Sequence, residues 1–228
     1  QAGSISSTYG TAATLAPLSV QYKSTGGPVV NLTLASSLGN NSYLYNDPYG
    51  GSVTFTLGAA NASLSGSGKL KADSYQLAGT VSNVTGGNFN GTAVYTGSLT
   101  LAPLAVQAST SQVSKLYDGS AVMNGLVLDM TPAAVSGDSV LVTGSGMYAT
   151  RNVGSNLSYS VTGLTLTGAD AGNYVLSGGA TSFSGNNGQI VAKTVTLTPQ
   201  AVSKVYDGSV VAAANLSQFS SQLGVTGD

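Results

Sequence analysis

The chain repeats itself at intervals close to 90 residues, and this period limits the folds open to it. Residues 8–21 align without gaps on residues 94–107, which places Pro103 86 residues after Pro17. A shorter third copy, residues 196–202, follows 96 residues after the second. One small β-sandwich domain has about 100 residues, whereas solenoid repeats and propeller blades have about 20–50. The period therefore predicts small domains in tandem.

Further markers recur in the same register and set the module boundaries. Residues 115–120 and 204–209 both have the pattern Lys-x-Tyr-Asp-Gly-Ser, and Val-Ser-Gly-Asp at 135–138 returns as Val-Thr-Gly-Asp at 225–228. The copies predict four parts: 1–14 as the tail of a preceding module, 15–100 as a divergent module, 101–197 as a second module, and 198–228 as the start of a third.

The composition favours strands within each module. Charged residues are 7% of the chain, against about 25% in an ordinary soluble domain. Ser, Thr, Asn and Gly supply the polarity instead, which suits strands joined by tight turns better than helices. Alternating apolar and hydroxyl residues predict strands, and clusters of Gly, Asn and Pro predict turns. The strands are expected at 29–34, 53–57, 140–142, 157–161, 164–166 and 195–197, and the turns at 39–41, 46–48, 86–88, 178–179 and 186–188.

Two local irregularities stand out from this pattern. Between Val161 and Leu164 the alternation slips by one residue at Gly163, which predicts a β-bulge. Residues 215–223 alone carry apolar residues at helical spacing and predict one short helix. The fold class is therefore all-β, with tandem small β-sandwich modules, either immunoglobulin-like or of a related two-layer type.

The linkers between modules are short. Only 14 residues separate Pro103 from Tyr117, and 7 separate Pro199 from Tyr206. An extended chain spans at most about 3.3–3.6 Å per residue, so little length is left for one module to fold back along its neighbour. We expect the modules to stack end to end, and the main partners of each module to be its neighbours in the same chain.

The residue types exclude several functions. The chain has no Cys, His, Trp or Glu, and its net charge is −1. Acid–base catalysis would fall to isolated Asp residues, and neither a nucleophile elbow nor a phosphate-binding loop is present. The few Lys and Arg are dispersed, which excludes nucleic acid as a partner. No apolar run approaches the length of a membrane-spanning helix. We expect no enzyme activity, no catalytic residue and no cofactor.

A calcium site would have to be assembled from distant loops. Calcium takes six to eight oxygen ligands, usually with several carboxylates close together. The eight aspartates show no Asp-x-Asp pair, so no metal ligand is predicted from the sequence. They are Asp47, Asp73, Asp118, Asp129, Asp138, Asp170, Asp207 and Asp228.

In combination, five segments resemble the YDG and MBG-type repeats of bacterial filamentous-haemagglutinin-like adhesins. They are the Lys-x-Tyr-Asp-Gly-Ser elements at 115–120 and 204–209, Tyr-Ala-Thr-Arg-Asn-Val-Gly at 148–154, Leu-Thr-Leu-Thr-Gly-Ala-Asp-Ala-Gly-Asn-Tyr at 164–174, and the Pro-ended strand at 195–199. The resemblance covers residues 101–228. The first module departs from it, because no Tyr-Asp-Gly follows Pro17 and Ala-Asp-Ser-Tyr at 72–75 replaces Asp-Ala-Gly-Asn-Tyr.

The resemblance implies a setting and a function. Such repeats form stalks of large exoproteins exported by two-partner secretion, so the chain is expected at the bacterial cell surface or in the biofilm matrix. A stalk would hold a distal binding domain for cell aggregation, biofilm formation or attachment to a host or other surface. The alternative is a carbohydrate-binding module that contacts exopolysaccharide directly.

Three local patterns have both a functional and a structural interpretation. Residues 117–120 and 170–173 are interpreted as turns, with an Asx turn at Asp118 and a positive φ at Gly119. Residues 43–49 contain three tyrosines, which could stack on a sugar or, as we favour, form a hairpin with some Tyr in the core. Seven Asn-x-Ser/Thr sequons occur, at Asn31, Asn40, Asn61, Asn83, Asn90, Asn156 and Asn215. No ligand-binding residue is assigned from the sequence.

Overall fold

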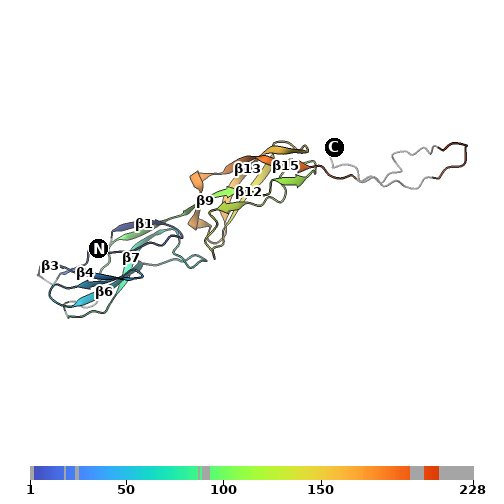
Figure 1. Cartoon of the computed structure of the whole chain (residues 1–228). Coiled ribbons are helices and arrows are strands. Elements are labelled where there is room, and N and C mark those ends of the chain that lie inside the picture. The colour runs from blue at the N-terminus through green and yellow to red at the C-terminus, as the bar shows by residue number, and fades with distance from the viewer. Residues whose placement is uncertain are drawn as a thin grey trace. The chain divides into compact units, whose positions relative to one another are not determined.

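The computed structural model describes residues 3–17, 19–23, 26–86, 88, 93–195 and 203–210. Within these ranges the chain is all-β, with fifteen strands, two single-turn 3₁₀ helices and no α-helix, as Figure 1 shows. The prediction of an all-β fold is confirmed. The predicted helix at 215–223 and most of the strand at 195–197 lie outside the described residues. No helix in the described ranges is long and apolar enough to cross a membrane.

The chain divides into two compact units. Unit 1 comprises residues 1–107, 130–142 and 165–179, and unit 2 comprises residues 108–129, 143–164 and 180–228. Two segments of the predicted second module, 130–142 and 165–179, therefore cluster with the first 107 residues. The tandem arrangement of modules stays a prediction.

Unit 1 is built on a six-stranded sheet with the order β1-β8-β7-β6-β5-β4. Strands β4 to β8 are joined as an antiparallel meander, and β1 runs parallel to β8 at the edge. The bounds are β1 Ser4–Thr8, β4 Thr33–Gly39, β5 Ser42–Asn46, β6 Ser52–Ala59, β7 Ser74–Ser82 and β8 Ser98–Ala102. A separate two-stranded sheet pairs β2, Gln21–Lys23, with β3, Val29–Asn31.

The inward-facing residues of this sheet form two separate hydrophobic clusters. The first contains Leu15, Leu57, Tyr75, Leu77, Leu99 and Leu101. The second contains Leu32, Tyr43, Tyr45 and Val53. Because alternate residues of a strand point to one face, the alternation predicted for 53–57 buries Val53 and Leu57 on the same side of β6.

The remaining strands form two further sheets. The three-stranded sheet has the order β11-β9-β14, and the four-stranded sheet has the order β10-β15-β13-β12. The bounds are β9 Leu104–Ser109, β10 Ser114–Leu116, β11 Asp129–Thr131, β12 Leu141–Tyr148, β13 Gly154–Thr167, β14 Tyr174–Leu176 and β15 Ser182–Val191, with the 3₁₀ helices η1 Ala171–Asn173 and η2 Ser177–Gly179 on either side of β14. β10 runs parallel to β15, and β13 runs antiparallel to it.

The irregularity predicted at Gly163 is present. Gly163 has a φ of 66°, and Val161 and Leu164 are both buried although they are three residues apart. In a regular strand two residues at an odd separation point to opposite faces. A glycine in the left-handed region lets β13 shift its phase and keep both side chains in the core.

The turn predicted at 186–188 is wrong, because these residues lie inside strand β15. Gly185 and Gly188 are needed there for a reason other than turning. A Cβ at Gly185 would collide with the Tyr159 ring, and one at Gly188 would lie 2.7 Å from Cε1 of Tyr148. The two rings meet edge to face with centroids 6.5 Å apart. Glycine inside a strand commonly marks such a close approach.

Candidate functional site

The first Lys-x-Tyr-Asp-Gly-Ser element, residues 115–120, is held by hydrogen bonds among its own residues. Asp118 Oδ1 accepts hydrogen bonds from the Ser120 backbone N–H at 3.0 Å and from Lys115 Nζ at 2.6 Å. Gly119 has a φ of 76°. The predicted Asx turn and positive φ are therefore confirmed. The hydrogen bond from Lys115, followed by that from the Ser120 N–H, holds the pKa of the Asp118 carboxyl below its ordinary value.

The second copy repeats this geometry. Asp207 Oδ1 accepts from the Ser209 N–H at 2.9 Å and from Lys204 Nζ at 2.7 Å, and Gly208 has a φ of 75°. The same bonds form in two places along the chain, so the six residues specify the turn by themselves. A carboxylate already bonded to its own loop is a poor candidate for a ligand contact.

The tyrosine-rich segment forms the predicted hairpin. Tyr43 and Tyr45 lie on β5 and are 7% and 5% exposed, whereas Tyr49 is 75% exposed. Tyr45 packs edge to face on Phe55 at 6.0 Å. Asp47, itself buried, accepts hydrogen bonds from the Tyr49 N–H and the Tyr22 hydroxyl at the turn. Only one of the three rings of this segment is therefore available to stack on a sugar.

Four of the described sequon asparagines have a left-handed backbone. Asn40, Asn61, Asn83 and Asn156 have φ values between 50° and 56° and are exposed. Asparagine is enriched in the left-handed region because its side chain bonds the local backbone. Asn40 and Asn61 lie in turns, whereas Asn156 lies in β13 where its pairing with β15 shifts register. Asn31 is in β3, and Asn90 and Asn215 are outside the described residues.

The most extensive buried polar arrangement lies in unit 1 around Asp138. Its Oδ2 accepts hydrogen bonds from the hydroxyls of Tyr9 and Tyr174, and its Oδ1 accepts from the Ser67 N–H at 3.0 Å. Tyr9 and Tyr174 are 1% and 5% exposed, and their rings meet edge to face at 5.5 Å. The Tyr9 hydroxyl also lies 2.7 Å from Ser65 Oγ.

Two further side chains extend this arrangement, which we call the carboxylate seam. Asp170 accepts from the Gly66 N–H at 3.1 Å and the Ser139 N–H at 2.9 Å. Asn173 Oδ1 accepts from the Ala72 N–H at 2.9 Å. Both side chains are buried, at 5% and 2% exposure. The seam comprises Tyr9, Ser65, Gly66, Ser67, Ala72, Asp138, Ser139, Asp170, Asn173 and Tyr174.

Glycine lets the two sides of the seam approach closely. A Cβ added at Gly66 would lie 2.6 Å from the Gly137 carbonyl oxygen and 2.9 Å from Asp170 Oδ2. Gly137 itself has a φ of 100°, and a Cβ there would lie 3.0 Å from the Ser67 Cα. The backbones at Gly66 and Gly137 are therefore in direct contact, and neither position has room for a side chain.

Burial and hydrogen bonds shift the pKa values of Asp138, Tyr174 and Tyr9 in the seam. Burial opposes ionisation of Asp138, but hydrogen bonds from Tyr174, Tyr9, Ser67 and Ser65 outweigh it and hold the pKa of this carboxyl well below its ordinary value. Burial and the Asp138 carboxylate raise the pKa of the Tyr174 hydroxyl well above its ordinary value. The same two causes raise the pKa of Tyr9. At neutral pH the centre is one carboxylate held by two neutral phenols.

Sequence reasoning placed Asp170 and Asn173 in a turn, which is correct, since the Asn173 N–H bonds the Asp170 carbonyl at 3.0 Å. It did not see that their side chains bond residues about 100 positions earlier. Tyr9, Ser67 and Asp138 were not singled out at all. The only available signal was recurrence, because Tyr9 aligns on Tyr95 and the Val-Ser-Gly-Asp element ending at Asp138 returns at 225–228.

In each of the two larger sheets, the strand that comes first in the chain pairs with the one that comes last, and we call these the entry and exit strands of that sheet. β1 pairs in parallel with β8 over five residue pairs, from Ser4 with Ser98 to Thr8 with Ala102. β10 pairs in parallel with β15 over three residue pairs, from Ser114 with Gln189 to Leu116 with Val191. In each case the first strand runs beside the last strand of its sheet region and in the same direction.

The described residues contain no group of three or more His, Cys, Asp or Glu side chains placed to hold a metal ion. The carboxylates of the seam accept hydrogen bonds from backbone N–H groups and from phenol hydroxyls.

Comparison with known families agrees with part of the resemblance. A family model described as the YDG domain matches residues 100–182, so this part of the chain carries a YDG domain. Asp138, Asp170, Asn173 and Tyr174 lie inside the match, whereas Tyr9 and the 65–72 segment lie outside it. Neither a curated protein nor a solved structure matches the chain.

Proposed function

We propose that this chain is a structural stalk segment of a large secreted bacterial surface adhesin. On this proposal it lies at the cell surface or in the biofilm matrix, and it holds a distal binding domain away from the cell for aggregation, biofilm formation or attachment. The finer fold belongs to the same proposal, with β-sandwich modules stacked end to end. The observation that carries the proposal is the parallel pairing of entry and exit strands.

Parallel pairing determines how a pulling force acts on the hydrogen bonds between the two strands. A pull on the chain before β1 and after β8 draws Ser4 and Ala102 in opposite directions along the two paired strands. All five residue pairs are then strained together, and backbone bonds beyond them, such as Tyr9 N–H to Ala102 O at 2.8 Å, share the strain. An antiparallel pair pulled from its open ends would lose its bonds one at a time. The arrangement suits a chain that carries mechanical load between its ends.

The carboxylate seam supports the same function. It ties the YDG match to Tyr9 and to the 65–72 segment through hydrogen bonds, of which those from Tyr9 and Ser67 go to the ionised carboxylate of Asp138. Hydrogen bonds to charged groups contribute about 1.5–3 kcal/mol each. A flexible linker between modules would contribute none of this. The seam therefore favours consecutive modules that resist being pulled apart.

Force spectroscopy on the whole chain, pulled from its two ends, tests the strand argument. We expect Ser7→Pro in β1 to lower the unfolding force of unit 1, because the N–H at position 7 points toward β8, as that of Tyr9 does, and proline cannot donate this hydrogen bond. Ser36→Pro in β4, at the opposite edge of the same sheet, is the matched control and should lower that force far less. Equal loss of force in both variants would contradict the proposal.

A replacement experiment separates a stalk from a binding module. In the parent polypeptide, exchanging this segment for an unrelated β-repeat of equal length should preserve adhesion, whereas deleting it should reduce adhesion. If the segment binds exopolysaccharide itself, the exchange would abolish adhesion, and the isolated chain would be retained on immobilised polysaccharide. Small-angle scattering adds a check on stacking. A radius of gyration near the value for a compact globule of this length, about 17 Å, would exclude an end-to-end arrangement.

A further inference from the structure

Unit 1 contains a cavity of about 520 Å³ between its two hydrophobic clusters. Its apolar wall is formed by the core faces of β6 and β7 and by one residue before β4. These residues are Leu32, Val53, Phe55, Leu57, Leu77 and Val81. Leu57 and Leu77 belong to the first cluster, whereas Leu32 and Val53 belong to the second. The cavity is therefore lined by residues of both clusters.

The volume falls within the range of small-molecule sites. Ligand pockets in proteins occupy about 300–1,000 Å³ and are lined mainly by apolar side chains with a few placed polar groups. An apolar cavity of about 150 Å³ already binds a benzene ring. A space more than three times larger, with an apolar wall, is suited to an aliphatic or aromatic body.

One polar group in the wall lacks a partner. The hydroxyl of Tyr95 is buried and, among the described residues, makes no hydrogen bond. Its ring lies against the bare backbone of β7, because a Cβ at Gly79 would lie 2.9 Å from Tyr95 Cε1. Burial raises the pKa of this phenol, which keeps it a neutral donor. A buried hydroxyl without a partner is destabilising, so the occupant of the cavity should offer it an oxygen.

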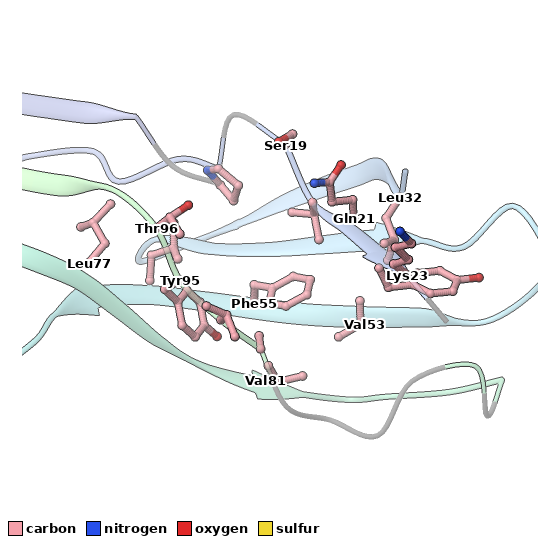
Figure 2. A pocket seen from close by; sticks show the side chains of 16 residues that line it. Ser19, Gln21, Lys23, Leu32, Val53, Phe55, Leu77, Val81, Tyr95 and Thr96 are labelled. Carbon is pink, nitrogen blue, oxygen red and sulfur yellow. The ribbon is translucent and has the colours of Figure 1, made fainter. Parts of the chain in front are cut away.

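A single charge marks the other end. Among the described residues that line the cavity, Lys23 is the only charged one, and its side chain is exposed. Figure 2 shows Tyr95 and Lys23 on opposite sides of Phe55. The lining therefore has a phenol donor on one side of Phe55 and an ammonium donor on the other, with apolar side chains between them.

We propose that this cavity binds an aliphatic molecule with a carboxylate at one end and a hydroxyl at the other. The carboxylate pairs with Lys23, the chain packs on Phe55 and its apolar neighbours, and the hydroxyl bonds Tyr95. This binding site is independent of the stalk function, since neither the entry and exit strand pair nor the carboxylate seam contributes to it.

Titration of the whole chain with three probes tests the proposal. They are 10-hydroxydecanoate, decanoate and decanol, followed by calorimetry or by NMR of ¹³C-labelled ligand. We expect 10-hydroxydecanoate to bind at one site per chain and about 5–10-fold more tightly than decanoate, from one neutral hydrogen bond. Decanoate should bind about 2–5-fold more tightly than decanol, from one exposed ion pair.

A separate variant tests each of the two binding preferences. Tyr95→Phe should remove the preference for the hydroxylated probe, and Lys23→Gln should remove the preference for decanoate over decanol. Lys71→Gln, which changes a lysine of unit 1 that does not line the cavity, should change neither. Val81→Phe should fill the cavity and abolish binding while the thermal transition of unit 1 is retained.

The outcomes are decisive in both directions. Saturable binding with both preferences lost in the matching variants supports the proposal. Absence of saturable binding by all three probes overturns it and indicates that side chains of the chain itself fill the space. Equal binding of decanoate and decanol overturns the assignment of an anionic ligand. Unchanged binding in Val81→Phe, with the fold retained, places the ligand elsewhere and also overturns the proposal.

Discussion

Two aspartates of unit 1 and one of unit 2 have opposite roles. In unit 1, Asp138 and Asp170 are bonded by residues up to 129 positions away. In unit 2, Asp118 is bonded within its own loop by Lys115 and Ser120, and its side chain is 39% exposed. The same residue type therefore joins distant segments at Asp138 and Asp170 and shapes a local turn at Asp118. The comparison shows that an aspartate of a repeat motif can be interpreted only once its donors are known.

The most direct test of this difference is to replace one aspartate in each unit and compare the losses of unfolding free energy. We expect Asp138→Ala to cost about 3–5 kcal/mol of unfolding free energy, because it leaves two phenols and a backbone N–H without their acceptor. Asp118→Ala removes the acceptor of a surface ion pair and of one turn hydrogen bond, and we expect it to cost far less. Urea denaturation of both variants provides the measurement. Equal costs would mean that the seam adds nothing beyond a surface interaction.

A second variant tests whether the stability of unit 2 depends on the glycines of β15, as we expect the stability of unit 1 to depend on the carboxylate seam. Gly185→Val should destabilise unit 2 by about 1–3 kcal/mol because the new side chain meets the Tyr159 ring. The double variant with Tyr159→Ala makes room for the valine and should recover part of the loss. Thermal unfolding followed by circular dichroism gives the comparison, and an undisturbed melt of Gly185→Val would show that the ring can move aside.

A third prediction concerns the local turn. Gly119→Val should cost about 1–3 kcal/mol, since φ at this position is positive and a β-branched residue is strained there. Gly172→Val, whose Cβ would meet nothing within 4 Å and whose φ is not in the left-handed region, is the control. Hydrogen exchange should show the destabilisation in unit 2 and leave the amides of β6 and β7 protected. Equal effects of the two substitutions would contradict the turn argument.

The smallest expected effect is on the pH dependence of stability. The folded pKa of Asp138 is depressed, so its contribution is present above about pH 4, the ordinary value for a carboxyl, and is lost as the pH falls through the folded pKa. The folded pKa of Tyr174 is raised, so its contribution is present below about pH 10 and is lost as the pH rises further. Unit 1 should therefore be most stable between these limits. Asp138→Asn should flatten the acidic side of the profile, and an unchanged acid limb in that variant would count against the seam.

Sequence reasoning succeeded where structure is decided locally. The Asx turn at Asp118, the positive φ at Gly119 and the phase shift at Gly163 each depend on a few adjacent residues. The alternation at 53–57 likewise predicted a strand, which is part of β6. These features follow from backbone sterics and from the two-residue period of a strand.

It failed where a residue acts through a distant partner. Residues 186–188 were predicted as a turn, yet they lie in β15, where Gly188 makes room for Tyr148 as Gly185 does for Tyr159. Asp170 and Asn173 form the turn that their sequence predicts, but their side chains also bind the backbone at Gly66 and Ala72. A single sequence does not reveal such long-range contacts, because the residues around a position do not identify its distant partner.

The local turn at 115–120 also has a consequence for refolding. Its bonds join residues at most seven positions apart, so closing the loop costs little conformational entropy. The chain has no cysteine, so refolding requires no disulfide to re-form. We expect these short turns to be the first elements to return after the chain has been unfolded. On the stalk proposal, each Lys-x-Tyr-Asp-Gly-Ser element would then be a point at which a stretched segment begins to refold.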